Sequence, residues 1–212
     1  MVTFILVRHG FSMGNKEKKF SGQMDVPLDE AGLRQAESVS EYIYNTFKAD
    51  KIYSSDLCRA FDTVKPLAQA LGTEVIKTKA FREVDVGKWQ GRLIEDVKKE
   101  YPESFQFYKE KPGIARFDGG ETYGECQKRA LDEIVKIAKE NDGKTIVIGT
   151  HGGVIRNLRA AFTQTPLENI EAIPHVPNAS ITVAQYENGK FILKAVGLTD
   201  YLTDKITEEG VK

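Results

Sequence analysis

Two short apolar runs, at residues 4–7 and 145–149, constrain the fold of this chain most strongly. Each run is flanked by polar residues and is too short for a core helix, which is typical of a buried strand. The chain is therefore expected to build its core around a sheet. Four further segments predict strands, the last two joined by an Asn-Gly hairpin turn: 51–54, 74–78, 180–186 and 190–196.

Amphipathic helical stretches alternate with these strands, at about residues 29–47, 57–71, 122–140 and 154–161. Asp29 is the predicted N-cap of the first. Ser55 or Asp56 is the predicted N-cap of the second, in which Pro66 predicts a kink or a break. The alternation predicts an α/β three-layer sandwich, in which helices cover both faces of a mostly parallel central sheet.

The length of 212 residues suits one domain, and we expect residues 1–212 to form it. Residues 81–120 are the least regular part, with short helical pieces interrupted by prolines. We interpret them as an insertion or lid over one end of the sheet. The tail from Thr203 is charged and is expected to be frayed.

Charge and cysteine content exclude several classes of protein. The net charge of −1 gives no broad basic field, so neither nucleic acid nor a membrane surface is an expected partner. No apolar run approaches membrane-spanning length, and the N-terminus lacks the pattern of a signal peptide. Cys58 and Cys126 form no Cys-x-x-Cys pair, which favours the reducing cytoplasm. The oligomeric state is left open, with a homodimer as one candidate.

Basic side chains follow three of the predicted strands at their carboxyl ends. The first strand ends at Arg8 and His9, the second ends just before Arg59, and the strand at 145–149 ends just before His151. Ligands of parallel sheets bind outside these ends, so the four side chains are expected to meet there. Two arginines and two histidines without a carboxylate cluster predict a pocket for a phosphoryl group.

The start of the next helix adds to this prediction. Gly152 and Gly153 have no side chains to cover the start of this helix, so its free backbone amides are expected to form an anion site. Two other kinds of phosphate site are absent, since neither cysteine is followed six residues later by arginine and no Gly-x4-Gly-Lys-Ser/Thr loop occurs. Three scattered histidines are too few for a two-metal phosphatase. No metal or other cofactor is predicted.

Seven motifs, in order from residue 6 to 156, resemble those of the histidine phosphatase superfamily, in its phosphoglycerate-mutase-like branch. Each motif is weak by itself, but together they are highly specific. They are Leu6–Asn15, Phe20–Gly22, Asp25–Leu28, Tyr53–Ala60, Arg82–Gly91, Gly119–Thr122 and Thr150–Arg156.

This resemblance implies a metal-independent phosphatase that works through a phosphohistidine. His9, as a neutral imidazole, would attack phosphorus, while Arg8, Arg59 and His151 bind the equatorial oxygens. Glu83 matches the proton donor of the family. Together with the bare helix start, the resemblance implies a further set of substrate-binding residues: Asn15, Ser21, Gly22 and Gly152.

Two reactions share this chemistry, and the span after Glu83 distinguishes them. Mutases of the family bind a bisphosphoglycerate through extra basic residues in a longer insertion, whereas this span is short and has no paired arginines. We therefore expect a phosphomonoesterase that acts on a small phosphorylated metabolite. A phosphoglycerate mutase is the alternative, and an inactive binding or regulatory module is a third, less favoured interpretation.

The substrate itself is left open by the sequence. His175 is interpreted either as lining the pocket or as a loop histidine with its own partner. Trp89 is interpreted as an anchor of the lid in preference to a wall of the substrate pocket. Cys58 and Cys126 lie on helical stripes and are expected to pack. Several residues are candidates for the pocket mouth: Lys16, Lys18, Lys19, Phe20, Met24, Trp89, Arg116 and Phe117.

Overall fold

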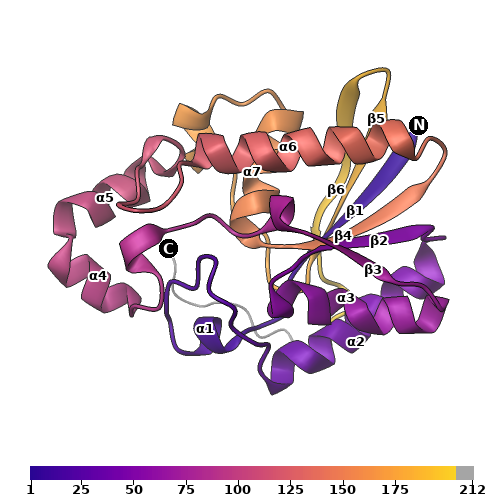
Figure 1. The fold of residues 1–212 in the computed structure, drawn as a ribbon, viewed down its shortest axis with the longest axis horizontal. Helices are drawn as coiled ribbons and strands as arrows, with labels where there is room; N and C mark the ends of the chain where they lie inside the picture. The colour runs from indigo at the N-terminus through magenta and orange to yellow at the C-terminus, as the bar shows by residue number, and fades with distance from the viewer. Residues whose placement is uncertain (204–212) are drawn as a thin grey trace.

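The computed structural model describes residues 1–203, and the rest of the predicted charged tail lies outside the described residues. Its centre is a six-stranded sheet in the order β3-β2-β4-β1-β5-β6 (Figure 1). Strands β1 to β4 run parallel, and β5 runs antiparallel to both β1 and β6. The mostly parallel sheet of the prediction is confirmed. The strands are β1 Val2–Arg8, β2 Lys51–Ser55, β3 Val75–Thr78, β4 Thr145–Thr150, β5 Ile181–Glu187 and β6 Lys190–Leu198.

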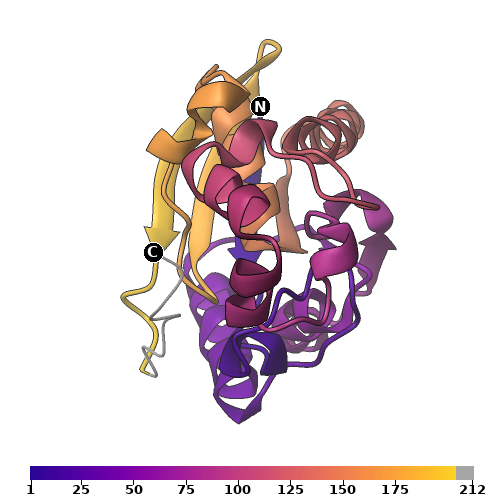
Figure 2. The same cartoon turned by 90° about the vertical axis from the view of Figure 1, so that its left-hand side faces the viewer.

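Helices cover both faces of this sheet, which confirms the three-layer sandwich (Figure 1, Figure 2). Side chains of β1 alternate between the two faces. Phe4 and Leu6 pack in the core cluster that includes α6 and α7, whereas Ile5 and Val7 pack in the cluster that includes α2 and α3. The covering helices are α2 Glu30–Thr46, α3 Cys58–Leu71, α6 Tyr123–Glu140 and α7 Gly152–Phe162.

The polar residues at the predicted helix starts differ in what they do. The Asp29 carboxylate accepts a hydrogen bond from a backbone amide of the first turn of α2, as predicted for its N-cap. The prediction that Ser55 or Asp56 caps α3 is wrong, because Leu57 is the N-cap, and the Cys58 amide in the first turn donates to the Asp25 carboxylate over 2.7 Å. The Asp56 carboxylate instead accepts two hydrogen bonds from the Arg82 guanidinium.

Helix α3 passes through Pro66, so the predicted break is absent. A proline inside a helix removes one backbone donor and is normally costly. Val64 and Leu67, which flank it, are buried in the core cluster that α3 shares with the sheet. This packing outweighs the lost hydrogen bond. The helix ends as predicted at Gly72, which has a φ of +63°.

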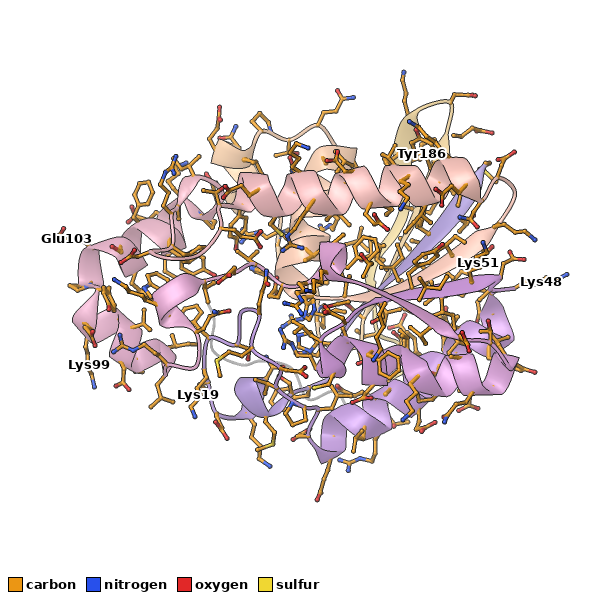
Figure 3. All side chains as sticks on the ribbon, viewed as in Figure 1. Lys19, Lys48, Lys51, Lys99, Glu103 and Tyr186 are labelled. Atoms are coloured by element: carbon orange, nitrogen blue, oxygen red, sulfur yellow. The ribbon has the colours of Figure 1, made fainter. Side chains whose placement is uncertain are left out.

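Residues 81–120 lie beyond the carboxyl ends of the parallel strands, at the left-hand end of the molecule in Figure 1. They contain α4 Ile94–Glu100 and α5 Pro102–Glu110. Lys99 and Glu103 on these helices point away from the body of the molecule (Figure 3). The remaining short elements are α1 Met13–Lys16, η1 Lys79–Phe81, η2 Gly87–Trp89, η3 Pro112–Ile114 and η4 Leu167–Ala172.

Between residues 1 and 203, no helix combines the length and the apolar character that crossing a bilayer requires.

Candidate active site

Strands β1, β2 and β4 deliver their basic side chains to one edge of the sheet. Arg8 is in register with Thr150, and the His9 amide donates to the Thr150 carbonyl over 2.9 Å. The His9 and His151 rings lie edge to face with their centroids 5.2 Å apart. The structure thus places the basic residues of the three strand ends together.

His9 is held in a form suited to a nucleophile. Its Nδ1 lies 2.7 Å from the Gly10 carbonyl oxygen and therefore donates to it, which leaves the lone pair on Nε2. Burial lowers the pKa of His9 well below its usual value, and the Arg59 and Arg8 charges lower it further. The imidazole is consequently neutral at neutral pH.

His151 lies behind His9 and is fully buried. Its Nε2 is 2.9 Å from the Ser55 hydroxyl, and its Nδ1 has no hydrogen-bond partner within the described part of the chain. Burial, followed by the Arg59 charge, lowers its pKa as well. His151 does not line the cavity described below, so its contact with the site runs through the His9 ring.

Both arginines are buried and anchored by backbone carbonyls. The Arg8 Nη1 donates to the Val176 carbonyl over 2.6 Å. The Arg59 guanidinium donates to the carbonyls of Met24 and Gly22 over 2.8 and 2.7 Å. A Cβ at Gly152 would lie 3.1 Å from the Arg8 Nε, so glycine at this position lets the guanidinium pack on the start of α7. Two fixed cations therefore face the space in front of His9.

The Glu83 carboxylate occupies the start of α7. Its Oε2 accepts a hydrogen bond from the Gly153 amide over 3.1 Å, and its Oε1 accepts one from the Val84 amide over 2.8 Å. The expectation that both glycine amides are free for phosphate is therefore wrong for Gly153. A Cβ at Gly153 would lie 2.4 Å from the Glu83 Oε1, so a side chain there would displace the carboxylate.

The ion pair between Arg129 and Glu121 holds the loop that carries Glu83. It was not predicted from the sequence. The Arg129 Nε and Nη2 donate to the two Glu121 carboxylate oxygens over 3.0 and 2.5 Å. Arg129 also donates to the carbonyls of Ala80 and Glu83 over 2.7 and 3.0 Å. Glu121 lies in one of the motifs that resemble the family, and this was the one sequence signal that could have pointed to the pair. Arg129, eight residues later on α6, gave none.

Asn15 lies in the short helix α1. Its Oδ1 accepts hydrogen bonds from the Ser12 amide over 2.9 Å and from the Asn178 Nδ2 over 3.3 Å. These two bonds identify Oδ1 as the acceptor, so the other atom of the Asn15 side-chain amide is the Nδ2 donor. Ser21 and Gly22 follow α1 and line the same cavity as Asn15. Gly152 lines it as well, so the structure gathers all four expected substrate-binding residues around one cavity.

These residues surround a cavity of about 320 Å³. Of the candidates for its mouth, Lys19, Phe20 and Phe117 line it and the others do not. Trp89 packs behind Phe20 and Phe117, with ring centroids 5.2 Å from each, so it anchors this wall from outside. His175 lines the cavity, and its Nε2 also accepts a hydrogen bond from Arg156 over 3.1 Å. It is therefore both a lining residue and a histidine with its own partner, as the two interpretations proposed separately.

No group of three or more histidine, cysteine, aspartate or glutamate side chains that could hold a metal ion is present among residues 1–203. Cys58 and Cys126 are unpaired thiols, and burial raises the pKa of both, that of Cys58 to about 12. Neither thiol is therefore activated as a nucleophile.

The buried histidines predict a loss of stability in mild acid. The folded-state pKa values of His9 and His151 lie well below 6.5, so the unfolded chain binds protons there that the folded chain does not. The free energy of unfolding must therefore fall as the pH falls below 6.5. Each of these two histidines contributes ~1 kcal/mol between pH 6.5 and 5.5, and His175, whose pKa is also lowered, acts in the same direction. Urea unfolding at the two pH values measures this, and equal stability at both would contradict the neutral pair.

Comparison with known proteins agrees with this arrangement. The family model described as histidine phosphatase superfamily (branch 1) matches residues 4–199. Phosphoserine phosphatase 1 of Hydrogenobacter thermophilus is 31% identical over 208 residues, covering 98% of each chain. Phosphoglycerate mutase-like protein 4 of Arabidopsis thaliana is 32% identical over 205 residues, covering 94% of this chain and 86% of its own. A mycobacterial glucosyl-3-phosphoglycerate phosphatase, solved with VO3, superimposes with a TM-score of 0.87 at 27% identity, covering 93% of this chain and 99% of its own.

Proposed function

The chain belongs to branch 1 of the histidine phosphatase superfamily, and from this we propose that it is a metal-independent phosphomonoesterase in which His9 is the nucleophile. Its substrate is a small phosphorylated metabolite, as the names of its phosphatase relatives support. The observation that carries the proposal is the neutral His9 imidazole beside Arg8 and Arg59, with its lone pair on Nε2.

In the first step the His9 Nε2 attacks phosphorus, so that the N–P bond forms as the ester O–P bond breaks. Arg8 and Arg59 bind the phosphoryl oxygens and balance the charge that develops on them. Glu83, in its acid form, gives its proton to the departing alkoxide. In the second step Glu83 accepts a proton from water, whose oxygen bonds to phosphorus as the N–P bond breaks. Phosphate is released and the proton on Glu83 is restored.

The charges along the cavity support hydrolysis over phosphoryl transfer between hydroxyl groups. A mutase must hold a bisphosphorylated intermediate and needs cations for its second phosphate. Among the lining residues of the described chain, Lys19 is the only cation besides Arg8 and Arg59. Its Nζ is paired with the Glu17 carboxylate over 2.7 Å. Residues 81–120, which we propose act as a lid, supply no cation to the lining.

The test measures phosphate release from 4-nitrophenyl phosphate by the purified protein. We expect release into water that depends on His9. In a parallel assay with 3-phosphoglycerate, we expect no isomerisation to 2-phosphoglycerate. Rapid isomerisation without net phosphate release would support the mutase, and absence of both reactions would support an inactive module.

Treatment with excess EDTA, followed by removal of the chelator, is expected to leave the rate of phosphate release unchanged. The reason is that positive charge at the phosphoryl group comes from arginines and not from a metal ion. The measurement is the initial rate before and after treatment, with a metal-dependent phosphatase as positive control for the chelator. A marked loss that added divalent ions restore would refute metal independence.

We also propose that the protein works in the cytoplasm. The support is chemical, because both cysteines are free thiols and a reducing compartment keeps them so.

A further inference from the structure

Beyond its phosphate-binding end, the cavity is walled by aromatic and aliphatic side chains. From this we infer that the enzyme selects phosphomonoesters whose alcohol part is uncharged and carries a compact ring. The inference rests on the phosphatase activity proposed above and concerns only the part of the substrate that departs as an alcohol.

One wall consists of the aromatic rings of Phe20, Tyr108 and Phe117. The Tyr108 centroid lies 6.2 Å from that of Phe20 and 5.5 Å from that of Phe117. Trp89 packs on all three from behind, and Phe105 supports Phe20. Because the rings fix one another, the wall is formed before substrate binds. Such a surface favours a ring that stacks on it or meets it edge to face.

The other lining residues near this wall are also uncharged. Val84, Val86 and Ile94 are aliphatic, and Tyr123 is buried with only a phenol as its polar group. Apolar walls with a few polar groups are the usual composition of a small-molecule site. Phenol hydroxyls serve a neutral hydroxyl group of a ligand without requiring a charge on it.

His175 adds a neutral donor at the mouth. The Arg156 guanidinium can only donate, so the His175 Nε2, 3.1 Å from its Nη1, must accept and the ring proton must lie on Nδ1. Loss of solvation and the Arg156 charge lower the pKa of His175 to about 3. His175 is exposed at the mouth, and the adjacent Arg156 guanidinium disfavours a second positive charge on its ring. The imidazole therefore brings no positive charge.

A charged alcohol part finds few partners here. Within residues 1–203, Glu83 is the only carboxylate that lines the cavity, and two backbone amides already hold it. Lys19 lies at the outer edge of the molecule in Figure 3 and is paired with Glu17. The ammonium and carboxylate of phosphoserine would both lose water against the aromatic walls. Apart from the two arginines at the phosphate-binding end, the charged residues in the described lining are Glu83 and Lys19, and each is already bonded, so this loss is poorly compensated.

The size of the cavity agrees with a compact substrate. Its volume of about 320 Å³ is at the low end of the range of roughly 300–1,000 Å³ for small-molecule sites. A phosphoryl group and one six-membered ring are of the right order to fill it.

The test compares kcat/KM for benzyl phosphate and O-phosphoserine. Both are esters of primary alcohols, so the comparison reports recognition of the alcohol more than its departure. We expect benzyl phosphate to have a kcat/KM at least tenfold higher. Equal or better turnover of phosphoserine would overturn the inference and leave the phosphatase activity intact. If neither ester nor 4-nitrophenyl phosphate is hydrolysed above the background of the His9→Ala variant, the proposed function itself fails.

Substitution of the wall provides an independent test. Phe117→Ala is expected to lower kcat/KM for benzyl phosphate at least tenfold and that for phosphoserine less than twofold. Phe107→Ala is the matched control, because Phe107 is 46% exposed on α5 and does not line the cavity, so neither value should change. Phe117→Leu serves if the alanine variant fails to fold, and unchanged inhibition by inorganic phosphate shows that the phosphate-binding end is intact. Equal losses for both esters would overturn the inference.

Discussion

Replacement of His9 by alanine is expected to abolish phosphatase turnover, by roughly 10⁴-fold or more, which is the scale on which covalent enzymes lose rate without their nucleophile. No neighbouring group can take over. His151 is behind His9 and outside the cavity, and the thiols of Cys58 and Cys126 have raised pKa values. The measurement is the initial rate of phosphate release from 4-nitrophenyl phosphate.

The same experiment needs a check on folding and on the intermediate. His9 is only 5% exposed, so thermal melting of the variant must show a folded protein before its rate is interpreted. Acid-labile phosphate on the protein is expected after rapid quenching of the native enzyme and not of the variant. More than a few per cent of residual activity in a folded variant would rule out His9 as the nucleophile.

Replacement of Glu83 by glutamine is expected to slow hydrolysis of alkyl phosphates by roughly 10²–10⁴-fold, the usual contribution of a general acid. Glutamine keeps the size of the side chain and one of the two acceptor oxygens, so it retains the hydrogen bond from either Val84 or Gly153 and loses the other. Thermal melting of the variant checks that the loop remains folded. It cannot give a proton to an alkoxide. The nitrophenolate ion leaves without protonation, so phosphorylation of His9 by 4-nitrophenyl phosphate should be slowed much less.

Steady-state and burst kinetics on both substrates separate these effects. A burst of nitrophenol with slow later turnover is expected, since the proposed mechanism also has Glu83 activate water in the second step. Glu121→Gln is the matched control, because it weakens the Arg129 pair that holds the Glu83 loop without removing the acid. Equal slowing of alkyl and nitrophenyl esters by Glu83→Gln would argue against the acid role.

The framework of the fold could be predicted because its signals are periodic. The apolar runs of β1 and β4 and the stripes of α2 and α6 encode the layers. Strand ends then carry Arg8, His9 and His151 to one edge, since parallel strands share a direction. Rules based on local sequence, such as those for helix caps, gave wrong predictions where the residue makes a tertiary contact instead. Asp56 has the chemistry of a helix cap, but Arg82 binds it instead.

The remainder of the site could not be read from spacing. Glu83 was found through resemblance alone, because it lies on an irregular loop whose position depends on Arg129 and on the start of α7. The aromatic wall had no periodic signal either. Phe20 and Phe117 are 97 residues apart and meet only through Trp89 and Tyr108. Contacts between irregular segments follow from the folded chain as a whole and not from any local pattern.

The position of β1 in the sheet has a consequence for biosynthesis. Strand β1 pairs with β4 and β5, which are translated more than 130 residues after it. Arg8 also depends on the Val176 carbonyl for its anchor. Contacts so distant along the chain form slowly, and the nascent polypeptide keeps an apolar strand unpaired in the meantime. A prematurely terminated product that contains Arg8 and His9 but lacks β4 and β5 therefore cannot form this site.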